Sequence, residues 1–233
     1  ARLDDATFGE IHRAFLEHQA IFFRDQTLSP EQYLAFAKRW GEIHFYPYMK
    51  GLDGFPEIFE LVKTEDATPV FGNRWHSDQM YIPIPAKATM LYAKELPPVG
   101  GDTLFANLYQ AYEALSPGMK RMLADVRTYN DGDNKARYGG KSRAEWYGTQ
   151  GMGGKLQAVQ TEAVVGEHPL VRTHPETGRK ALFIGDQTRR FVDMTDDESK
   201  PLVDYLMAHA TRPEFTCRFR WRAPGALALW DNR

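Results

Sequence analysis

Short apolar segments separated by turn residues make up most of the chain from residue 58 onward. Glycine, proline and aspartate stand between these segments, and all three favour turns. A succession of short strands joined in this way is typical of a β-sandwich or a β-barrel. The sequence therefore predicts a mostly β fold, and we expect strands at residues 58–62, 89–93, 104–106, 170–172, 181–184, 215–221 and 226–230.

Helices are predicted to flank these strands. Apolar residues from Phe8 to Leu16 recur at helix spacing. Ser29–Gln32 combines an N-cap serine with a proline at the first helical position, and Thr195–Glu198 forms a capping box. We therefore expect helices over most of residues 1–40 around a short strand at 20–23, over 108–126 with a break at Ser116-Pro117, and over 195–210.

The chain shows neither an internal repeat nor a linker, so we expect a single domain over residues 1–233. It begins without methionine and stops at Arg233 directly after a strand-like run, which leads us to expect a fragment truncated at both ends. Residues 130–160 are polar and rich in glycine, and they are too many for an ordinary turn. We predict that this segment is a lid.

Charge and cysteine content argue against several classes of protein. The 29 Lys and Arg nearly balance the 31 Asp and Glu, which argues against a basic face for nucleic acid. No apolar run approaches the length of a membrane-spanning helix. The single cysteine, Cys217, cannot form an internal disulfide. We expect a cytoplasmic protein with no nucleic-acid or membrane partner, and we leave open whether it forms a homo-oligomer.

His76 and Asp78 are the first candidates for chemistry. We predict a strand at Trp75–Asp78, in which residues two apart point to the same face. An imidazole nitrogen beside a carboxylate oxygen supplies part of the site of two histidines and one carboxylate that holds non-haem Fe(II). A His-x-Asp alone also fits a surface strand end in which the histidine hydrogen-bonds to the aspartate.

Several further motifs follow the pair in a fixed order. They are Glu95–Phe105, Arg172–Phe183 and Trp230–Arg233, with Phe23–Gln26 and Arg39–His44 upstream. With these motifs the chain resembles the taurine dioxygenase/2,4-dichlorophenoxyacetate dioxygenase (TauD/TfdA) family of Fe(II)- and 2-oxoglutarate-dependent dioxygenases over essentially its whole length. The resemblance implies a double-stranded β-helix (jelly-roll) core with flanking helices.

The resemblance also implies roles for individual residues. His76 and Asp78 match the first histidine and the carboxylate of the iron site, and Thr103 matches the threonine whose hydroxyl binds a carboxylate of 2-oxoglutarate. A hydroxyl donor suits a carboxylate, although Thr103 also fits a β-branched strand residue after a Gly-Gly turn. The third iron ligand, a histidine, and the arginine that pairs with 2-oxoglutarate are expected beyond Arg233.

The remaining histidines are not expected to bind metal. In the family the stretch around His174 is a strand, a turn at residues 175–178 and a returning strand, so we interpret His174 as structural. The others lack a partner at ligand spacing, and we expect surface or hydrogen-bonded core residues at His12, His18, His168 and His209.

The family chemistry predicts the reaction. Fe(II), 2-oxoglutarate and O₂ would hydroxylate a small organic acid, with succinate and CO₂ as co-products. Where the hydroxylated carbon bears a heteroatom leaving group, the product would fall apart. The alternatives are a non-catalytic jelly-roll binding module and a cupin-like metal hydrolase or isomerase, which would need no Thr103.

The predicted substrate contacts differ from those of taurine dioxygenase. Tyr46 stands where that enzyme has a histidine, Met49 aligns with its sulfonate-side tyrosine, and Gly72 aligns with its asparagine. Taurine is therefore not expected as the substrate. Tyr46, Tyr48 and Arg74 are our candidates for substrate contact, although Arg74 also suits a surface position. We expect a small organic anion with an aromatic or branched apolar body.

Overall fold

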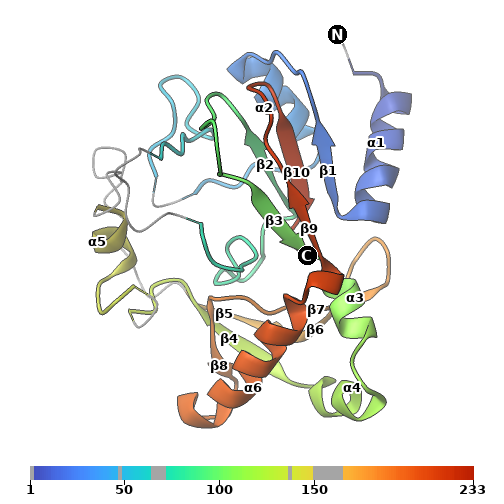
Figure 1. The fold of residues 1–233 in the computed structure, drawn as a ribbon, viewed down its shortest axis with the longest axis vertical. Helices are drawn as coiled ribbons and strands as arrows, with labels where there is room; N and C mark the ends of the chain where they lie inside the picture. The colour runs from blue at the N-terminus through green and yellow to red at the C-terminus, as the bar shows by residue number, and fades with distance from the viewer. Residues whose placement is uncertain (1–2, 47–48, 64–71, 136–137, 149–164) are drawn as a thin grey trace.

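The computed structural model describes residues 3–46, 49–63, 72–135, 138–148 and 165–233. Within them, one group of strands lies above another along the longest axis, with helices on the outer sides (Figure 1). The helices are α1 (Asp5–His18), α2 (Pro30–Lys38), α3 (Leu108–Glu113), α4 (Pro117–Leu123), α5 (Arg143–Tyr147) and α6 (Asp196–Ala210), with a 3₁₀ turn at Pro213–Phe215. The strands are β1 (Ala20–Phe23), β2 (Ala88–Tyr92), β3 (Thr103–Ala106), β4 (Arg127–Asp131), β5 (Val165–Pro169), β6 (Val171–Thr173), β7 (Lys180–Leu182), β8 (Thr188–Phe191), β9 (Thr216–Phe219) and β10 (Leu227–Asp231).

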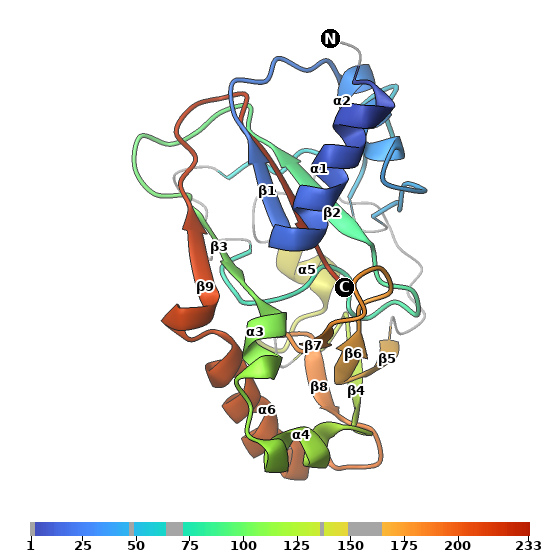
Figure 2. The same ribbon diagram turned by 90° about the vertical axis from the view of Figure 1, so that its right-hand side faces the viewer.

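Strand β10 is the centre of the upper sheet, where it pairs antiparallel with β1 on one side and β2 on the other. Successive side chains of β10 point to opposite faces. Leu229 packs against Phe15 of α1 and Trp40, which follows α2. Ala228 faces the other way, toward Phe219 of β9. β10 is thus buried on both faces between the N-terminal helices and the β3–β9 pair (Figure 2).

Aromatic stacking joins the two upper sheets. The rings of Phe22 and Phe219 lie parallel, with centroids 4.0 Å apart, and Trp221 meets Phe219 edge-on at 4.8 Å. Such pairs add to the free energy gained by burying the rings. The contact fixes β9 and the residues after it against the face of β1 and β10 that lies opposite α1.

The lower half contains β4, β5 and β8 in one sheet and the β6–β7 hairpin, with α3, α4 and α6 packed outside them. Its core is apolar: Leu206 of α6 lies in one cluster with Leu170, Leu182 and Phe191. No helix in the described part of the chain is both long and apolar enough to cross a membrane.

The predicted alternation of short strands with flanking helices is confirmed for most segments. Both capping boxes are present, at Ser29 and Thr195. The helical stretch over 108–126 is broken where expected, since Ser116 caps α4. The strands expected at 20–23, 89–93, 104–106, 170–172, 181–184, 215–221 and 226–230 correspond, within a few residues at each end, to β1, β2, β3, β6, β7, β9 and β10.

The strand expected at residues 58–62 is wrong. Ile58 accepts a hydrogen bond from the N–H of Leu52 at 2.7 Å and donates its own N–H to Phe55 at 3.0 Å. Both backbone groups of Ile58 are therefore satisfied inside a local turn rather than by a neighbouring strand.

Strands β4, β5 and β8 were not predicted because buried polar residues interrupt their hydrophobic pattern. Thr128 and Asn130 of β4 are fully buried. The Asn130 amide donates to Gly166 of β5 and accepts from the Thr188 hydroxyl of β8. Side-chain hydrogen bonds help to join these strands, where apolar contacts join strands elsewhere in the protein. Hydrophobic periodicity alone could therefore not reveal this sheet.

We predict that Gly225→Ala destabilises the protein more than Gly100→Ala does. Both glycines have nearly the same positive φ, +86° and +84°, which costs a non-glycine residue about 1–3 kcal/mol. A Cβ at Gly225 would also lie 2.5 Å from the Gln26 carbonyl oxygen, whereas one at Gly100 meets nothing within 4 Å. Denaturant unfolding should show an additional loss of about 1–3 kcal/mol for Gly225→Ala. Equal losses of unfolding free energy in the two variants would contradict the close contact between Gly225, just before β10, and Gln26, just after β1.

Candidate functional site

His76 and Asp78 lie in a loop, so the strand expected at Trp75–Asp78 is wrong. Two hydrogen bonds from the connection between β7 and β8 hold this loop. The Asp186 N–H donates to the Trp75 carbonyl at 3.0 Å, and the Gln187 side chain donates to the Ser77 carbonyl at 3.2 Å. The two side chains still meet, with His76 Nε2 3.4 Å from Asp78 Oδ1.

A glycine lets the β7–β8 connection approach the loop so closely. A Cβ at Gly185 would lie 2.7 Å from Met80 Sδ and 3.2 Å from the Cα of His76. Any larger residue would push the loop away from β7. The position of His76 therefore depends on a residue more than a hundred positions later in the chain.

The hydrogen bond of the other ring nitrogen fixes the tautomer of His76. Nδ1 lies 2.7 Å from the Arg74 carbonyl oxygen. A carbonyl can only accept, so Nδ1 is protonated, and Nε2, which faces Asp78, is the nitrogen that a metal could bind once its own proton leaves. This arrangement is common for histidines that bind metals.

The charges around the pair favour an ionised Asp78. Burial raises its pKa, but hydrogen bonds from His76 and Thr89, together with the charge of Arg143, lower the pKa overall. For His76, burial lowers the pKa, whereas the Asp78 carboxylate and the nearby charge of Asp186 raise it to about 9. The raised pKa means that, without a metal, His76 Nε2 carries a proton toward Asp78, and a divalent cation could replace this proton between the two side chains.

A neutral imidazole nitrogen and a carboxylate oxygen suit Fe(II) and similar divalent metals. The pair therefore fits the proposed metal on the basis of its own donor atoms. Among the residues that the structure describes, no third His, Cys, Asp or Glu joins His76 and Asp78 in a metal-binding group.

Thr103 is the first residue of β3, which agrees with the alternative interpretation of Thr103 as a strand residue. Its hydroxyl oxygen accepts a hydrogen bond from the indole N–H of Trp221 at 3.0 Å. The indole is only a donor, so the threonine hydrogen points elsewhere and suits a carboxylate acceptor. No hydrogen bond or ion pair between described residues connects Thr103 with His76 or Asp78.

The three substrate candidates differ in their placement. Tyr48 lies outside the described residues. Arg74 is exposed, which agrees with the alternative of a surface position, and its backbone carbonyl accepts the hydrogen bond from His76 Nδ1. Tyr46 is partly buried, and its ring stacks on Phe59 with centroids 5.1 Å apart.

Sequence reasoning missed Arg143, the buried cation next to Tyr46. Arg143 is 5% exposed, and its Nη2 donates to the Tyr46 hydroxyl at 2.8 Å. The guanidinium also lies over the Tyr81 ring, 4.7 Å from the centroid. A capping box at Ser142 and Glu145 could have revealed the short helix α5 that positions Arg143.

The predicted lid overlaps this region. Residues 136–137 and 149–160 of the 130–160 segment lie outside the described residues, so the lid stays a prediction. The described part contains the last residues of β4 and helix α5.

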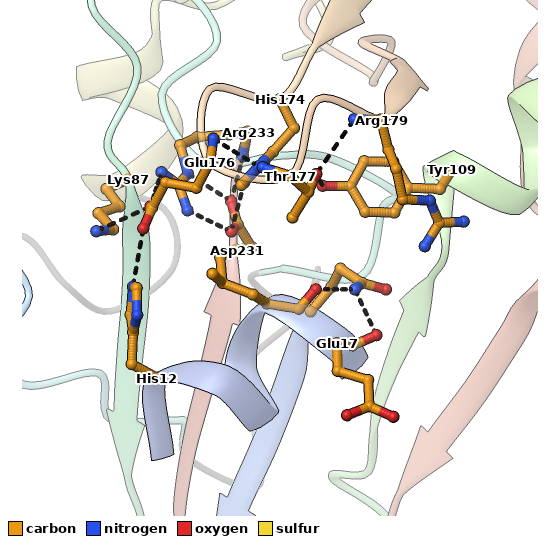
Figure 3. A network of polar contacts seen from close by, with 12 residues as sticks. His12, Glu17, Lys87, Tyr109, His174, Glu176, Thr177, Arg179, Asp231 and Arg233 are labelled. Carbon is orange, nitrogen blue, oxygen red and sulfur yellow. Dashed lines mark hydrogen bonds and ion pairs between the residues drawn. The ribbon is translucent and has the colours of Figure 1, made fainter. Parts of the chain in front are cut away.

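His174 is held by an ionic network, as its interpretation as structural expects (Figure 3). Its Nδ1 accepts the backbone N–H groups of Glu176 and Thr177, so Nε2 carries the proton and donates to Asp231 Oδ2 at 3.1 Å. Both ring nitrogens are then occupied, and neither is left for a metal.

Asp231 and Glu176 extend this network to other elements. Arg233 binds both oxygens of Asp231 and reaches Glu176 at 2.5 Å. Glu176 also pairs with Lys87, just before β2, and with His12 of α1. The network thus joins α1, the β6–β7 turn and the ends of β2 and β10.

The other histidines also fit structural or surface positions. His168 lies 3.0 Å from the Ile82 carbonyl, and His209 lies 2.8 Å from the Ala111 carbonyl. Both are buried, while His18 is exposed in the last turn of α1. This agrees with the expectation for these residues.

Comparison with known proteins places the whole chain in one group. The family model described as "Taurine catabolism dioxygenase TauD, TfdA family" matches residues 1–233. Alkylsulfatase from Acinetobacter baylyi is 34% identical over 235 residues, covering 100% of the chain and 71% of the relative. (S)-phenoxypropionate/alpha-ketoglutarate-dioxygenase from Sphingobium herbicidovorans is 33% identical over 241 residues, covering 100% and 80%.

Solved structures agree with these sequence relatives. A taurine dioxygenase from Burkholderia xenovorans matches with a TM-score of 0.79 and 33% identity, covering 100% of the chain and 73% of that structure. AAD-2 in complex with Mn(II) and N-oxalylglycine matches with a TM-score of 0.79 and 28% identity, covering 100% and 82%.

We predict that Glu176→Gln removes an acid-sensitive part of the stability. Burial raises the pKa of Glu176, but hydrogen bonds from Arg233 and Lys87 outweigh it and hold the pKa at about 2. A depressed folded-state pKa stabilises above the unfolded value of about 4.3, and this stabilisation is lost as the pH falls toward 2. Unfolding free energies measured from pH 7 to 2 should fall less steeply for Glu176→Gln than for wild type.

The exposed Glu10 of α1 supplies the matched control, since Glu10→Gln should keep the wild-type pH profile. Parallel profiles for wild type and Glu176→Gln would show that the network does not stabilise the fold through this carboxylate.

Proposed function

The chain belongs to the TauD/TfdA family of dioxygenases, and we propose that His76 and Asp78 hold its Fe(II) while Thr103 binds a carboxylate of 2-oxoglutarate. The observation that carries this proposal is the hydrogen bond from His76 Nδ1 to the Arg74 carbonyl, which leaves Nε2, beside the Asp78 carboxylate, as the nitrogen available to a metal. The unused hydrogen of the Thr103 hydroxyl supports the second part.

The chain is an Fe(II)- and 2-oxoglutarate-dependent dioxygenase with a jelly-roll core, as the sequence motifs led us to expect. When bound, Fe(II) and 2-oxoglutarate convert O₂ into one hydroxyl oxygen on the substrate and one oxygen in succinate, with loss of CO₂. A non-catalytic binding module and a cupin-like hydrolase or isomerase are therefore set aside.

A histidine and an arginine beyond Arg233 would complete the proposed site, as the resemblance implies. The histidine would be the third iron ligand, and the arginine would pair with the far carboxylate of 2-oxoglutarate. This protein's own residues would bind and orient the two co-substrates and exclude water, while the metal carries out the oxidation.

The proposed substrate is a small organic anion with an apolar body. Relatives of the chain are named for alkyl sulfates, phenoxypropionate and sulfate esters, which are anions of this kind. In this chain Tyr46 offers a flat ring and a hydroxyl. The hydroxyl accepts a hydrogen bond from the buried Arg143 guanidinium, and such a bond strengthens a hydroxyl as a donor to an anion.

Hydroxylation of the carbon bound to the ester or ether oxygen of such a substrate would give an unstable product. Its collapse would release the sulfate or the aryl alcohol together with a carbonyl compound.

We also place the protein in the cytoplasm without a nucleic-acid or membrane partner, because its charge is nearly balanced and its one cysteine has no partner for an internal disulfide.

We predict that His76→Ala or Asp78→Ala abolishes succinate formation, because either change removes a ligand that the metal needs. The assay uses the polypeptide that includes the expected third ligand, with Fe(II), 2-oxoglutarate and substrate. His18→Ala changes an exposed histidine of α1 and should keep wild-type turnover. Succinate formation at the wild-type rate in either site variant would overturn the iron assignment.

We predict that Arg143→Met raises KM for an anionic substrate about tenfold, because the Tyr46 hydroxyl loses the charged donor that strengthens it as a donor to the anion. KM for 2-oxoglutarate should stay within a few-fold of wild type. Turnover is measured with an alkyl sulfate, an aryloxyalkanoate, a neutral alcohol and an alkylamine as substrates.

Arg74→Met is the matched control, since it removes the exposed arginine that the sequence offered as a candidate for substrate contact. A large effect of Arg74→Met with none of Arg143→Met would assign the anion to the other side chain. Turnover of the neutral or cationic compounds alone would contradict the proposed substrate class.

A further inference from the structure

Asp78, Thr89 and Asn232 form a closed ring of three hydrogen bonds. The Thr89 hydroxyl of β2 donates to Asp78 Oδ2 at 2.7 Å. The Asn232 side-chain amide donates to the Thr89 hydroxyl oxygen at 2.8 Å. The backbone N–H of Asp78 donates to Asn232 Oδ1 at 3.3 Å, which closes the ring.

Each bond of the ring determines the direction of the next. The Asp78 N–H can only donate, so the Asn232 carbonyl oxygen faces it and the amide NH₂ faces Thr89. Because the Thr89 oxygen then accepts from Asn232, its own hydrogen is directed to Asp78 Oδ2. The orientations of the amide and of the hydroxyl follow from the partners and leave no second arrangement that satisfies all three groups.

The ring treats the two oxygens of Asp78 differently. Oδ2 is engaged by Thr89, while Oδ1 faces His76 Nε2 at 3.4 Å. A carboxylate can bind a metal through one oxygen or through both. A metal that must also accept 2-oxoglutarate and O₂ needs open positions, so a ligand that takes one position suits it better.

We propose that Thr89 and Asn232 are positioning residues that make Asp78 a ligand through Oδ1 alone. The inference rests on the proposed role of Asp78 as a metal ligand. Thr89 acts by holding Oδ2, and Asn232 acts by directing the Thr89 hydroxyl.

The ring is well placed to be rigid. Asn232 is 2% exposed, and its backbone N–H donates to the Lys87 carbonyl at 3.1 Å. Thr89 lies within β2, opposite Trp230 of β10. The neighbours of Asn232, Asp231 and Arg233, belong to the ionic network around Glu176 (Figure 3). The two strands therefore set the geometry of the carboxylate on the loop.

The test compares Thr89→Val, which removes the hydroxyl at nearly constant shape, with Thr89→Ser, which keeps it. Binding of Fe(II) and of Co(II) is measured anaerobically in the polypeptide that includes the third ligand. We expect Thr89→Val to weaken metal binding about 10–100-fold, the usual effect of losing such a supporting contact. Thr89→Ser should stay within a few-fold of wild type. The visible spectrum of the Co(II) protein should change in Thr89→Val, because Oδ2 becomes free to coordinate.

Asn232→Asp tests the second positioning residue, since it replaces the donor amide by a carboxylate of the same shape. It should also weaken metal binding and alter the Co(II) spectrum. Thr128→Val is the control for loss of a buried strand hydroxyl away from the site: Thr128 is fully buried in β4 and donates to the His168 carbonyl. It should lower Tm without changing metal affinity.

The outcomes separate the inference from the function on which it rests. Wild-type protein that binds neither metal would overturn the proposed metal site itself. Wild-type binding that persists unchanged, with the same Co(II) spectrum, in Thr89→Val and Asn232→Asp would overturn the positioning role alone. Weaker binding in Thr89→Ser equal to that in Thr89→Val would also contradict it, because the hydroxyl would then not be the group that matters.

Discussion

The antiparallel pairing of β10 between β1 and β2 is the constraint on which the site depends. A central strand has all its backbone groups bonded to neighbours, so its position is fixed more firmly than that of a loop. The residues directly after Trp230 are therefore held by a rigid strand, and two of them form hydrogen bonds with distant parts of the chain. Asp231 anchors His174 and Arg233, and Asn232 reaches across to Thr89 and Asp78.

Rigidity at the end of β10 passes to a loop that has no regular structure of its own. The loop carrying His76 and Asp78 is held from β2, from β10 and from the connection between β7 and β8. Three separate supports determine where its side chains lie. The geometry of the proposed metal site thus depends on hydrogen bonds between side chains and backbone, which tolerate an irregular main chain.

Motifs in the sequence predicted that His76 and Asp78 lie together, but not which contacts hold them. Local signals such as the capping boxes at Ser29 and Thr195 determined helix starts correctly, because those contacts lie within four residues. The pairing of His76 with Asp78 was also foreseen, although from a strand that does not form. Gly185 could not be found from one sequence, since its contact with the His76 loop joins segments far apart in the chain, and no local pattern marks Thr89 as a partner of Asp78. The capping box at Ser142 and Glu145 could have indicated helix α5, but not that Arg143 reaches Tyr46. The two strand groups differ in the same way: apolar β10 was evident, whereas polar β4 was not.

The register of β1 with β10 has a consequence for synthesis of the protein. Ala20 lies opposite Trp230, so the two strands are separated by about 200 residues of chain. At the usual 5–20 residues per second, β1 would wait roughly 10–40 seconds on the ribosome before its partner emerges. During that time the apolar Ala-Ile-Phe-Phe edge has no strand to pair with and is open to wrong partners. The nascent chain must therefore keep this edge covered, by helix α1 or by a chaperone, until translation reaches β10.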